Sequence, residues 1–212
     1  MERKTILNDE EYLRQISRPV DLNDETYKKE IKLLEQFCLE TECFALAAVQ
    51  IGIPKRIIYL KNTTLDVPLE NMKHNESGVL INPIVTSRRG HTKYWEACLS
   101  CLDNMGLVSR PYEIDVQYYD KNGFENVQTF KGFEATVLSH ELDHLDGILH
   151  MDVAEEVLNM PLEERKLYRE THPYEVISKT CDYDEIIAKN KKKITCKNIK
   201  FVKMYCNIFI IC

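Results

Sequence analysis

Two histidines and a glutamate within a run of five residues have the chemistry to bind and activate a metal ion. His140, Glu141 and His144 occur in the run His-Glu-Leu-Asp-His. On a helix, side chains four positions apart lie on the same face, so both imidazoles can reach one ion. The glutamate beside them can then move protons to and from water at that ion. The plain alternative is a solvent-exposed helix that carries these three residues by chance.

A catalytic metal ion usually has three protein ligands, and the sequence offers two candidates for the third. His150 completes the spacing H-E-x-x-H-x-x-G-x-x-H, the signature of the metzincin proteases. Cys98 lies upstream in the run Glu-Ala-Cys-Leu-Ser and can supply a thiolate. Two observations favour Cys98. The methionine that a metzincin needs beneath its metal is matched only by Met160, which opens a predicted surface helix, and no apolar signal segment begins at the first residue.

Three segments, taken together and in order, resemble the peptide deformylase family. The first reads C-F-A-L-A-A-V-Q over residues 43–50, the second reads E-A-C-L-S over 96–100, and the third reads H-E-L-D-H-L-D-G over 140–147. The family patterns are G-h-G-L-A-A-x-Q, E-G-C-L-S and H-E-x-D-H-x-x-G. Metzincins have no counterpart of the first two patterns. The resemblance covers about residues 5–153 and favours Cys98 as the third ligand.

The resemblance implies a metal-dependent hydrolase that removes the formyl group from the N-terminal formyl-methionine of newly made proteins and releases formate. It implies one divalent ion, Fe²⁺ in most cells, for which Zn²⁺, Ni²⁺ or Co²⁺ can substitute. By the same resemblance, Glu141 handles the proton, while the side chain of Gln50 and the backbone N–H of Leu99 stabilise charge on the formyl oxygen. The metal ligands that it implies are Cys98, His140 and His144.

A pocket for the methionine side chain must be apolar, and several apolar residues lie within the motifs. Leu99 and Leu138 are also apolar and close by, but most apolar residues of a globular protein belong to its core. The residues that we expect to bind substrate are Phe44, Ala45, Leu46 and Val137.

Glu96 and Arg110 resemble a family ion pair that holds the loop of Cys98 in place. An ion pair of this kind would orient the metal ligands without touching the metal. The alternative is that they are two unrelated surface charges, which contribute little to stability.

The chain departs from the family pattern around the expected groove. Cys43 and Ala45 stand where the family usually has glycine, Ala97 replaces the glycine before the cysteine, and His150 stands at a position that is commonly apolar. Glycine lets a substrate backbone approach closely, so the methyl group of Ala45 is expected to crowd the substrate or to demand an unfavourable φ. A deformylase-like protein that binds metal and peptide but turns over slowly is therefore an alternative.

Length and composition are those of an ordinary globular protein. The chain has 212 residues, of which 44% are hydrophobic and 29% are charged, enough for one sizeable core. The absence of any apolar run of about 18 residues predicts that no helix spans a membrane. The eight cysteines are scattered and follow no secretory signal, which predicts reduced thiols in a cytoplasmic protein. The composition indicates no particular oligomeric state.

The motifs require a framework of short strands and two principal helices. Periodicity predicts one helix over residues 24–41 and a second over 132–145, which carries both histidines. The predicted strands cover 56–60, 79–82, 114–118 and 126–130, the last two joined as a hairpin. This mixture predicts an α+β fold, with a single domain of partly antiparallel sheets around the central metal-binding helix.

The charge distribution divides the chain into parts. We expect a catalytic domain over residues 1–155, a helical extension over 156–185 and a tail over 186–212. All 34 acidic residues precede the tail, whereas seven of the 28 basic residues are lysines within it. A basic tail on an acidic body could touch ribosomal RNA, which would suit an enzyme that acts on emerging chains. The alternative is a flexible, solvated tail, whose apolar last residues pack on the body or bind a partner.

Overall fold

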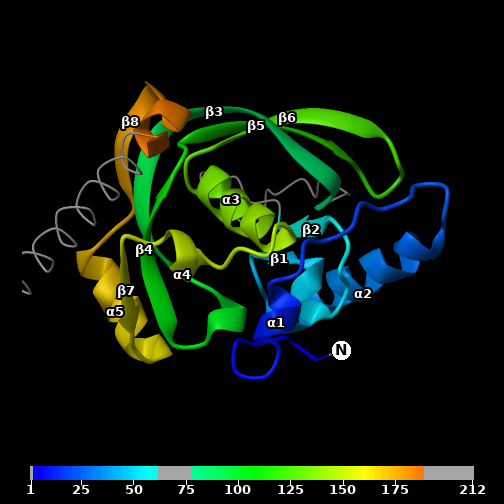
Figure 1. Ribbon diagram of the computed structural model, residues 1–212, viewed down its shortest axis with the longest axis horizontal. Coiled ribbons are helices and arrows are strands. Elements are labelled where there is room, and N and C mark those ends of the chain that lie inside the picture. Colours follow the sequence, from blue (N-terminus) through cyan, green and yellow to red (C-terminus); the bar gives the residue numbers. More distant parts are fainter. Residues whose placement is uncertain (1, 62–77, 189–212) are drawn as a thin grey trace, which may run out of the picture.

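A long, bent strand and its neighbours arch over one central helix. The computed structural model describes residues 2–61 and 78–188. Figure 1 shows the helix, α3 (Phe133–Leu145), beneath the arch that β3 (Val79–Ala97) forms with its neighbours. The described elements therefore form an α+β structure, in which one sheet encloses the helix that carries the His-Glu-x-x-His run.

All the named strands belong to one sheet. Their path runs β1-β2-β3-β4-β7, with β5 and β8 added at β3 and with β6 added at β5. Within the described residues, every pairing between these strands is antiparallel. Besides β3, the strands are β1 (Ala45–Ala47), β2 (Ile57–Leu60), β4 (Asn104–Arg110), β5 (Glu113–Tyr119), β6 (Glu125–Lys131), β7 (Glu156–Asn159) and β8 (Glu175–Asp182).

Strand β3 is much longer than the sequence predicted. The predicted strand ended at residue 82, whereas β3 has 19 residues and reaches Ala97, directly before Cys98. Its first part pairs with β2 and β5, and its last part pairs with β4 and β8. Residues 86–93 of β3 are mostly polar and show no hydrophobic alternation. Pairing with distant strands, rather than a local sequence pattern, therefore makes this part of β3 a strand. Gly90 permits the close packing, because a Cβ there would lie 2.6 Å from the Tyr112 side chain.

The two predicted helices are present. Helix α2 (Thr26–Thr41) begins two residues later than expected, after Asp24, whose carboxylate accepts a hydrogen bond of 3.0 Å from the Thr26 N–H. Helix α3 begins one residue later than expected, after Gly132. The other labelled α-helices are α1 (Glu10–Leu13), α4 (His150–Val153) and α5 (Leu162–Thr171), together with the 3-10 helices η1 (Ala48–Ile51) and η3 (Leu99–Cys101). Residues 183–188, at the end of the described chain, are also helical.

The central helix is held by its apolar face. Leu138, Leu142 and Leu145 are spaced four and three residues apart, and they pack into a core cluster with Val116 and Phe130 of the β5–β6 hairpin. Burying one such side chain stabilises a fold by about 1.5–3 kcal/mol, so this face fixes how α3 is rotated. The opposite face of α3 is therefore turned towards η1 and the end of β3.

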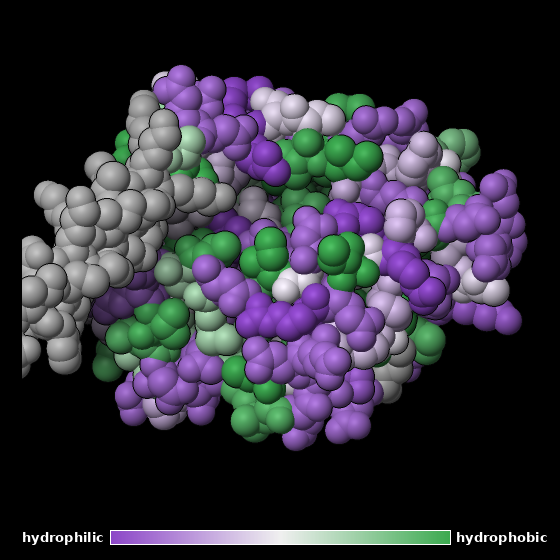
Figure 2. All heavy atoms as spheres, in the orientation of Figure 1, coloured by the Kyte–Doolittle hydropathy of each residue, from purple (hydrophilic) through white to green (hydrophobic). Residues whose placement is uncertain are grey.

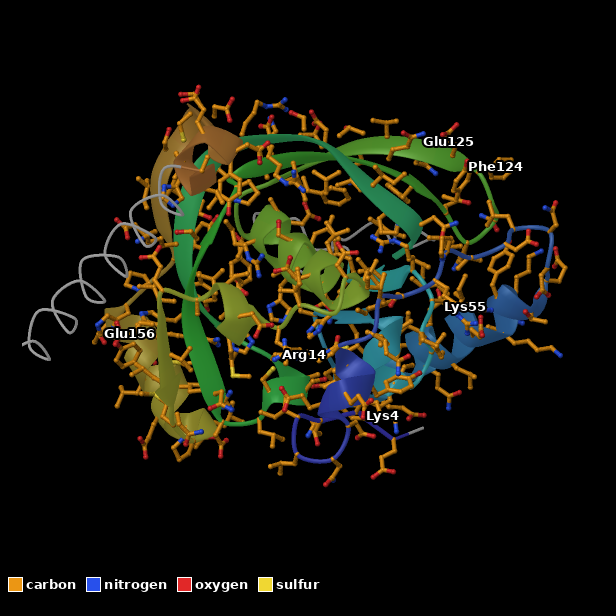
Figure 3. All side chains as sticks on the ribbon, viewed as in Figure 1. Lys4, Arg14, Lys55, Phe124, Glu125 and Glu156 are labelled. Atoms are coloured by element: carbon orange, nitrogen blue, oxygen red, sulfur yellow. The ribbon has the colours of Figure 1, made fainter. Side chains whose placement is uncertain are left out.

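The N-terminal segment joins the three motif segments. Backbone N–H groups donate hydrogen bonds from Lys4 to the Gln50 carbonyl at 2.8 Å and from Ile6 to the Ser100 carbonyl at 3.0 Å. A third bond runs from the backbone of residue 17 to the last residue of α3, at 2.8 Å. Figure 3 shows Lys4 and Arg14 beside α1, at this junction. Arg14 also pairs with the Asp152 carboxylate of α4.

The segment after residue 155 is only partly helical. The sequence predicted a helical extension over 156–185, but α5 is flanked by β7 and β8, which pair with β4 and β3. Strands β7 and β8 could not be predicted from local sequence, because their apolar residues gain partners only when the sheet forms. Of the predicted tail over 186–212, the residues from 189 onward lie outside the described residues. In the described part, no helix is long and apolar enough to cross a membrane.

Candidate functional site

The face of α3 opposite the core brings its two histidines to Cys98. The ligand atoms of Cys98, His140 and His144 all lie within 4.8 Å of one another. Nε2 of His144 is 3.2 Å from the Cys98 sulfur. All three residues are buried. Two imidazoles and a thiolate at these separations fit the tetrahedral donor set of a catalytic metal site, which keeps one position open.

The end of β3 places Cys98, and its surroundings favour the thiolate form. Its sulfur accepts hydrogen bonds from the Ser100 N–H and from Nε2 of Gln50, both at 3.4 Å. A hydrogen bond from the Cys101 thiol and the charge of His144 lower the pKa of Cys98 well below its usual range, although burial opposes them. The thiolate is the form that binds metals, so the sulfur is prepared for an ion.

Glu96 and Arg110 form a buried pair behind the cluster. Nε of Arg110 lies 2.8 Å from Oε1 of Glu96, and the two side chains are only 7% and 5% exposed. Nδ1 of His140 lies 2.8 Å from Oε2 of Glu96, and NH1 of Arg110 lies 2.6 Å from Asp143. Burial alone would raise the pKa of Glu96. The charge of Arg110 and the hydrogen bond with His140 nevertheless lower this pKa to about 2. These are therefore not two unrelated surface charges.

Glu141 lies beside the cluster but is not a member of it. Its Oε2 accepts a hydrogen bond of 2.8 Å from the Ala47 N–H, which holds the carboxylate against β1. Burial raises the pKa of Glu141, against the opposing charges of His140 and His144. A carboxyl group with a raised pKa exchanges protons more readily near neutral pH, as a general acid and base must.

Gln50 is buried in η1 with its amide directed at the cysteine loop. Besides the bond to the Cys98 sulfur, Nε2 lies 3.1 Å from Oγ of Ser100, while Oε1 accepts from the Ala47 N–H at 3.0 Å. These contacts fix which end of the amide faces the cluster. Leu99, the first residue of η3, is 40% exposed and places its backbone at the same opening.

A cleft of about 380 Å³ opens onto the cluster. The substrate-binding residues expected from the sequence all line it, namely Phe44, Ala45, Leu46 and Val137. Leu138 does not, because it is fully buried in the core cluster. The lining residues that sequence reasoning missed include Tyr94, Phe133 and Arg169. The Phe133 ring packs edge-on against Tyr94 at 5.2 Å, so aromatic rings stiffen this wall.

The structure removes two alternatives that the sequence had left open, one at His150 and one at Ala45. His150 is buried and its ring stacks on His140 at 5.6 Å, but it does not belong to the three-residue cluster. The metzincin arrangement is therefore not formed. Ala45 does not adopt a positive φ, since the described non-glycine residues that do are Glu42, Asn82 and Leu102. The expected strain at Ala45 is absent, and only crowding of the cleft remains.

Two imidazoles from one helix, a buried cysteine sulfur and an adjacent carboxylate are the groups that a metal-dependent hydrolase requires in its active site. Residues 3–159 match the model of the family described as polypeptide deformylase. A peptide deformylase of Pelagibacter ubique is 37% identical over 155 residues, which are 72% of this chain and 86% of the relative. One of Rhizobium meliloti is 41% identical over 145 residues, which are 66% of this chain and 78% of the relative.

Solved structures agree with these matches. A probable peptide deformylase from a Synechococcus phage has a TM-score of 0.59 and 34% identity, and the match covers 72% of this chain and 99% of that one. A peptide deformylase from Synechococcus elongatus in complex with actinonin has a TM-score of 0.62 and 29% identity, covering 81% and 85%. The chain belongs to the peptide deformylase family, whose enzymes are metal-dependent hydrolases that remove the formyl group from N-formyl-methionyl peptides.

Proposed function

We propose that this chain deformylates N-formyl-methionyl peptides with one divalent ion held by Cys98, His140 and His144. The observation that supports this most directly is the buried cluster of these three residues, with Glu141 beside it and outside it. When bound, such an ion makes a water molecule more acidic and polarises the formyl carbonyl. The roles below belong to the protein's own residues.

Glu141 is the residue that moves the proton. Its carboxylate takes the proton of the attacking water and delivers it to the amine nitrogen of methionine, which would otherwise leave as an unstable anion. The hydrogen bond from the Ala47 N–H holds the carboxylate in position for both transfers. The raised pKa caused by burial keeps the proton on Glu141 between them.

Gln50 and the backbone N–H of Leu99 stabilise the negative charge that develops on the formyl oxygen. An amide donates hydrogen bonds without titrating, so Gln50 serves at any physiological pH. Its contacts with Ser100 and Cys98 orient Nε2 before substrate arrives. This preorganisation is what makes such donors effective, because they need not rearrange during the reaction.

Cleft residues bind the methionine side chain and exclude water. Phe44, Leu46 and Val137 supply apolar surface, and an aromatic ring also makes favourable contacts with a thioether sulfur. Ala45 narrows the cleft where the family has glycine. Slow turnover by a deformylase-like protein is the second candidate function, and the position of Ala45 in the cleft wall is the observation that favours it.

We propose Fe²⁺ as the native ion, with Zn²⁺, Ni²⁺ or Co²⁺ able to substitute. One thiolate beside two imidazoles softens the site, which suits Fe²⁺ as well as Zn²⁺. Cytoplasmic location stays a prediction. Contact of the basic tail with the ribosome also stays a prediction, because the lysines that would make this contact lie outside the described residues.

Anaerobic purification, metal analysis and formate release from formyl-Met-Ala test this function together. We expect about one ion per chain and formate release that stops when the ion is removed by a chelator. A chain that holds its metal but releases formate no faster than the uncatalysed reaction would contradict the proposal. Low kcat/KM that improves with Ala45→Gly would instead support the slower, deformylase-like protein.

A further inference from the structure

One wall of the substrate cleft comes from beyond the part of the chain that matches the family model. The family match ends at residue 159, whereas Arg169 of α5 lines the cleft together with Tyr94 and Phe133. Helix α5 is anchored on the sheet by Tyr168, whose ring packs edge-on against Trp95 at 5.3 Å. The position of Arg169 is therefore a fixed property of this fold.

The guanidinium group of Arg169 is held in place through its Nε atom and through one face of its plane. Its Nε donates a hydrogen bond of 2.9 Å to the Trp95 carbonyl. Its central carbon lies 5.1 Å from the centroid of the Tyr94 ring, in a cation–π contact. Tyr94 in turn packs edge-on against Phe133. Because Nε is engaged and the plane is stacked, the two terminal nitrogens remain as a preformed fork.

This fork has no acidic partner in the part of the chain that the structure describes. No ion pair within residues 2–61 and 78–188 includes Arg169. Burial lowers the pKa of Arg169, and the charge of neighbouring Arg165 adds to this, as expected for a cation without a counter-ion. Of the acidic residues in the cleft, Glu96 is already bound by Arg110 and His140. Glu42 lines the cleft, is exposed and is likewise outside these ion pairs.

The distance between Arg169 and the Cys98, His140 and His144 cluster indicates which residue of a bound peptide Arg169 can reach. Trp95, which anchors Arg169, precedes Cys98 by three residues along β3, which corresponds to roughly 10 Å of extended strand. A formyl group at the cluster is followed by an extended peptide that also advances about 3.3 Å per residue. The third residue of the peptide therefore reaches the neighbourhood of Arg169.

We propose that Arg169 binds a carboxylate on the third residue of the formyl peptide, and thereby gives this enzyme a preference for acidic substrates. The carboxylate is either an Asp or Glu side chain or the free terminus of a tripeptide. Arginine binds carboxylates through two parallel, charge-assisted hydrogen bonds, which the free fork permits. This inference rests on the proposed function, because it places the formyl group at the Cys98, His140 and His144 cluster.

Steady-state kinetics with two matched pairs of peptides tests the proposal. One pair is formyl-Met-Ala-Asp-amide and formyl-Met-Ala-Asn-amide, and the other is formyl-Met-Ala-Ser with a free or an amidated terminus. At low salt we expect a KM about 3–10-fold lower for the carboxylate member of at least one pair, with kcat nearly unchanged. The pair that responds identifies which carboxylate is bound. High salt should reduce the preference.

Variants of two residues on α5 assign the preference to one side chain. Arg169→Gln keeps a donor for the Trp95 carbonyl but loses the charge, so it should abolish the preference, and the two members of the responsive pair should then have equal KM values. Arg169→Lys should retain part of the preference. Lys166→Gln is the matched control, because Lys166 is exposed, pairs with Glu163 at 3.5 Å and should leave the preference intact.

Equal KM values within both pairs for the wild type, or an undiminished preference in Arg169→Gln, would overturn the proposal. A wild type that releases no formate from any peptide would refute the proposed function instead. The peptide affinities of metal-loaded Glu141→Gln, measured by calorimetry, then decide about Arg169 without turnover. Tighter binding of the carboxylate peptides that disappears with Arg169→Gln supports it, and equal binding rejects it.

Discussion

Nδ1 of His140 lies 2.8 Å from Oε2 of Glu96, and this contact determines which nitrogen of His140 is free. The hydrogen on Nδ1 is donated to the carboxylate, so the lone pair of Nε2 is available to a metal ion. Arg110 holds the same carboxylate from its other side. His144 differs, since no hydrogen-bond partner for its Nδ1 occurs among the described residues. The two histidines are therefore oriented by different means.

Replacement of Glu96 should weaken metal binding without removing a ligand. In Glu96→Ala, His140 loses the carboxylate that orients its ring, and we expect the metal affinity to fall about 10–100-fold. Competition with a chromogenic chelator measures this. Glu113→Ala is the control, because Glu113 also pairs with a basic residue, Lys131 at 2.8 Å, but does not line the cleft. An equal loss of affinity in the control would mean that general destabilisation is the cause.

Glu141→Gln should keep the metal and lose catalysis. Gln is nearly isosteric and cannot carry the proton, so we expect formate release to fall by about 10²–10⁴-fold. Metal content and formate release are measured on the same anaerobic preparation. Loss of the ion in this variant would place Glu141 among the ligands and refute the role proposed for it.

Replacements of Cys98 and His150 separate the two ligand sets that the sequence allows. Cys98→Ser removes a member of the cluster and should lose most of the bound metal, whereas His150→Ala should retain it. Metal per chain is measured after desalting, with thermal unfolding as the check that both variants are folded. Retention in Cys98→Ser together with loss in His150→Ala would reverse the assignment.

Ala45→Gly tests whether the extra methyl group narrows the cleft. Ala45 lines the cleft and has no strained φ, so removing its Cβ should lower KM for a short formyl peptide and leave kcat nearly unchanged. Glycine also adds freedom to the unfolded chain, and we expect a loss of about 0.5–1 kcal/mol in stability. An unchanged or higher KM would indicate that the cleft is adapted to alanine.

Local patterns were sufficient for α3 because its two faces are both periodic. Leu138, Leu142 and Leu145 face the core, whereas Val137, Glu141 and His144, at the same spacing, face the cleft and the cluster. The rotation of the helix was therefore predictable from the positions of its leucines. The ordered motifs predicted that Cys98 would join the histidines, which no single segment could indicate.

Distant pairings were not predictable in the same way. The polar residues 86–93 of β3 become a strand because β4, β5 and β8 supply their hydrogen bonds. Arg169 reads in the sequence as one more charge on a surface helix, and nothing local indicates that its Nε binds the Trp95 carbonyl. Figure 2 shows a hydrophilic surface over much of α1 and α2. This surface is easier to predict from the sequence, because polar residues on the outer face of a helix contact solvent and need no particular partner.

The bonds from Lys4 to Gln50, from Ile6 to Ser100 and from residue 17 to Leu145 give the order of synthesis a consequence for folding. The N-terminal segment is synthesised first, but its partner Leu145 is synthesised only after most of the described chain. Contacts so far apart in sequence have a high entropic cost of closure and form slowly. The cysteine, both histidines and the segment that joins their surroundings can therefore assemble only as a late, concerted event, and a nascent chain has no metal-binding site to fill before then.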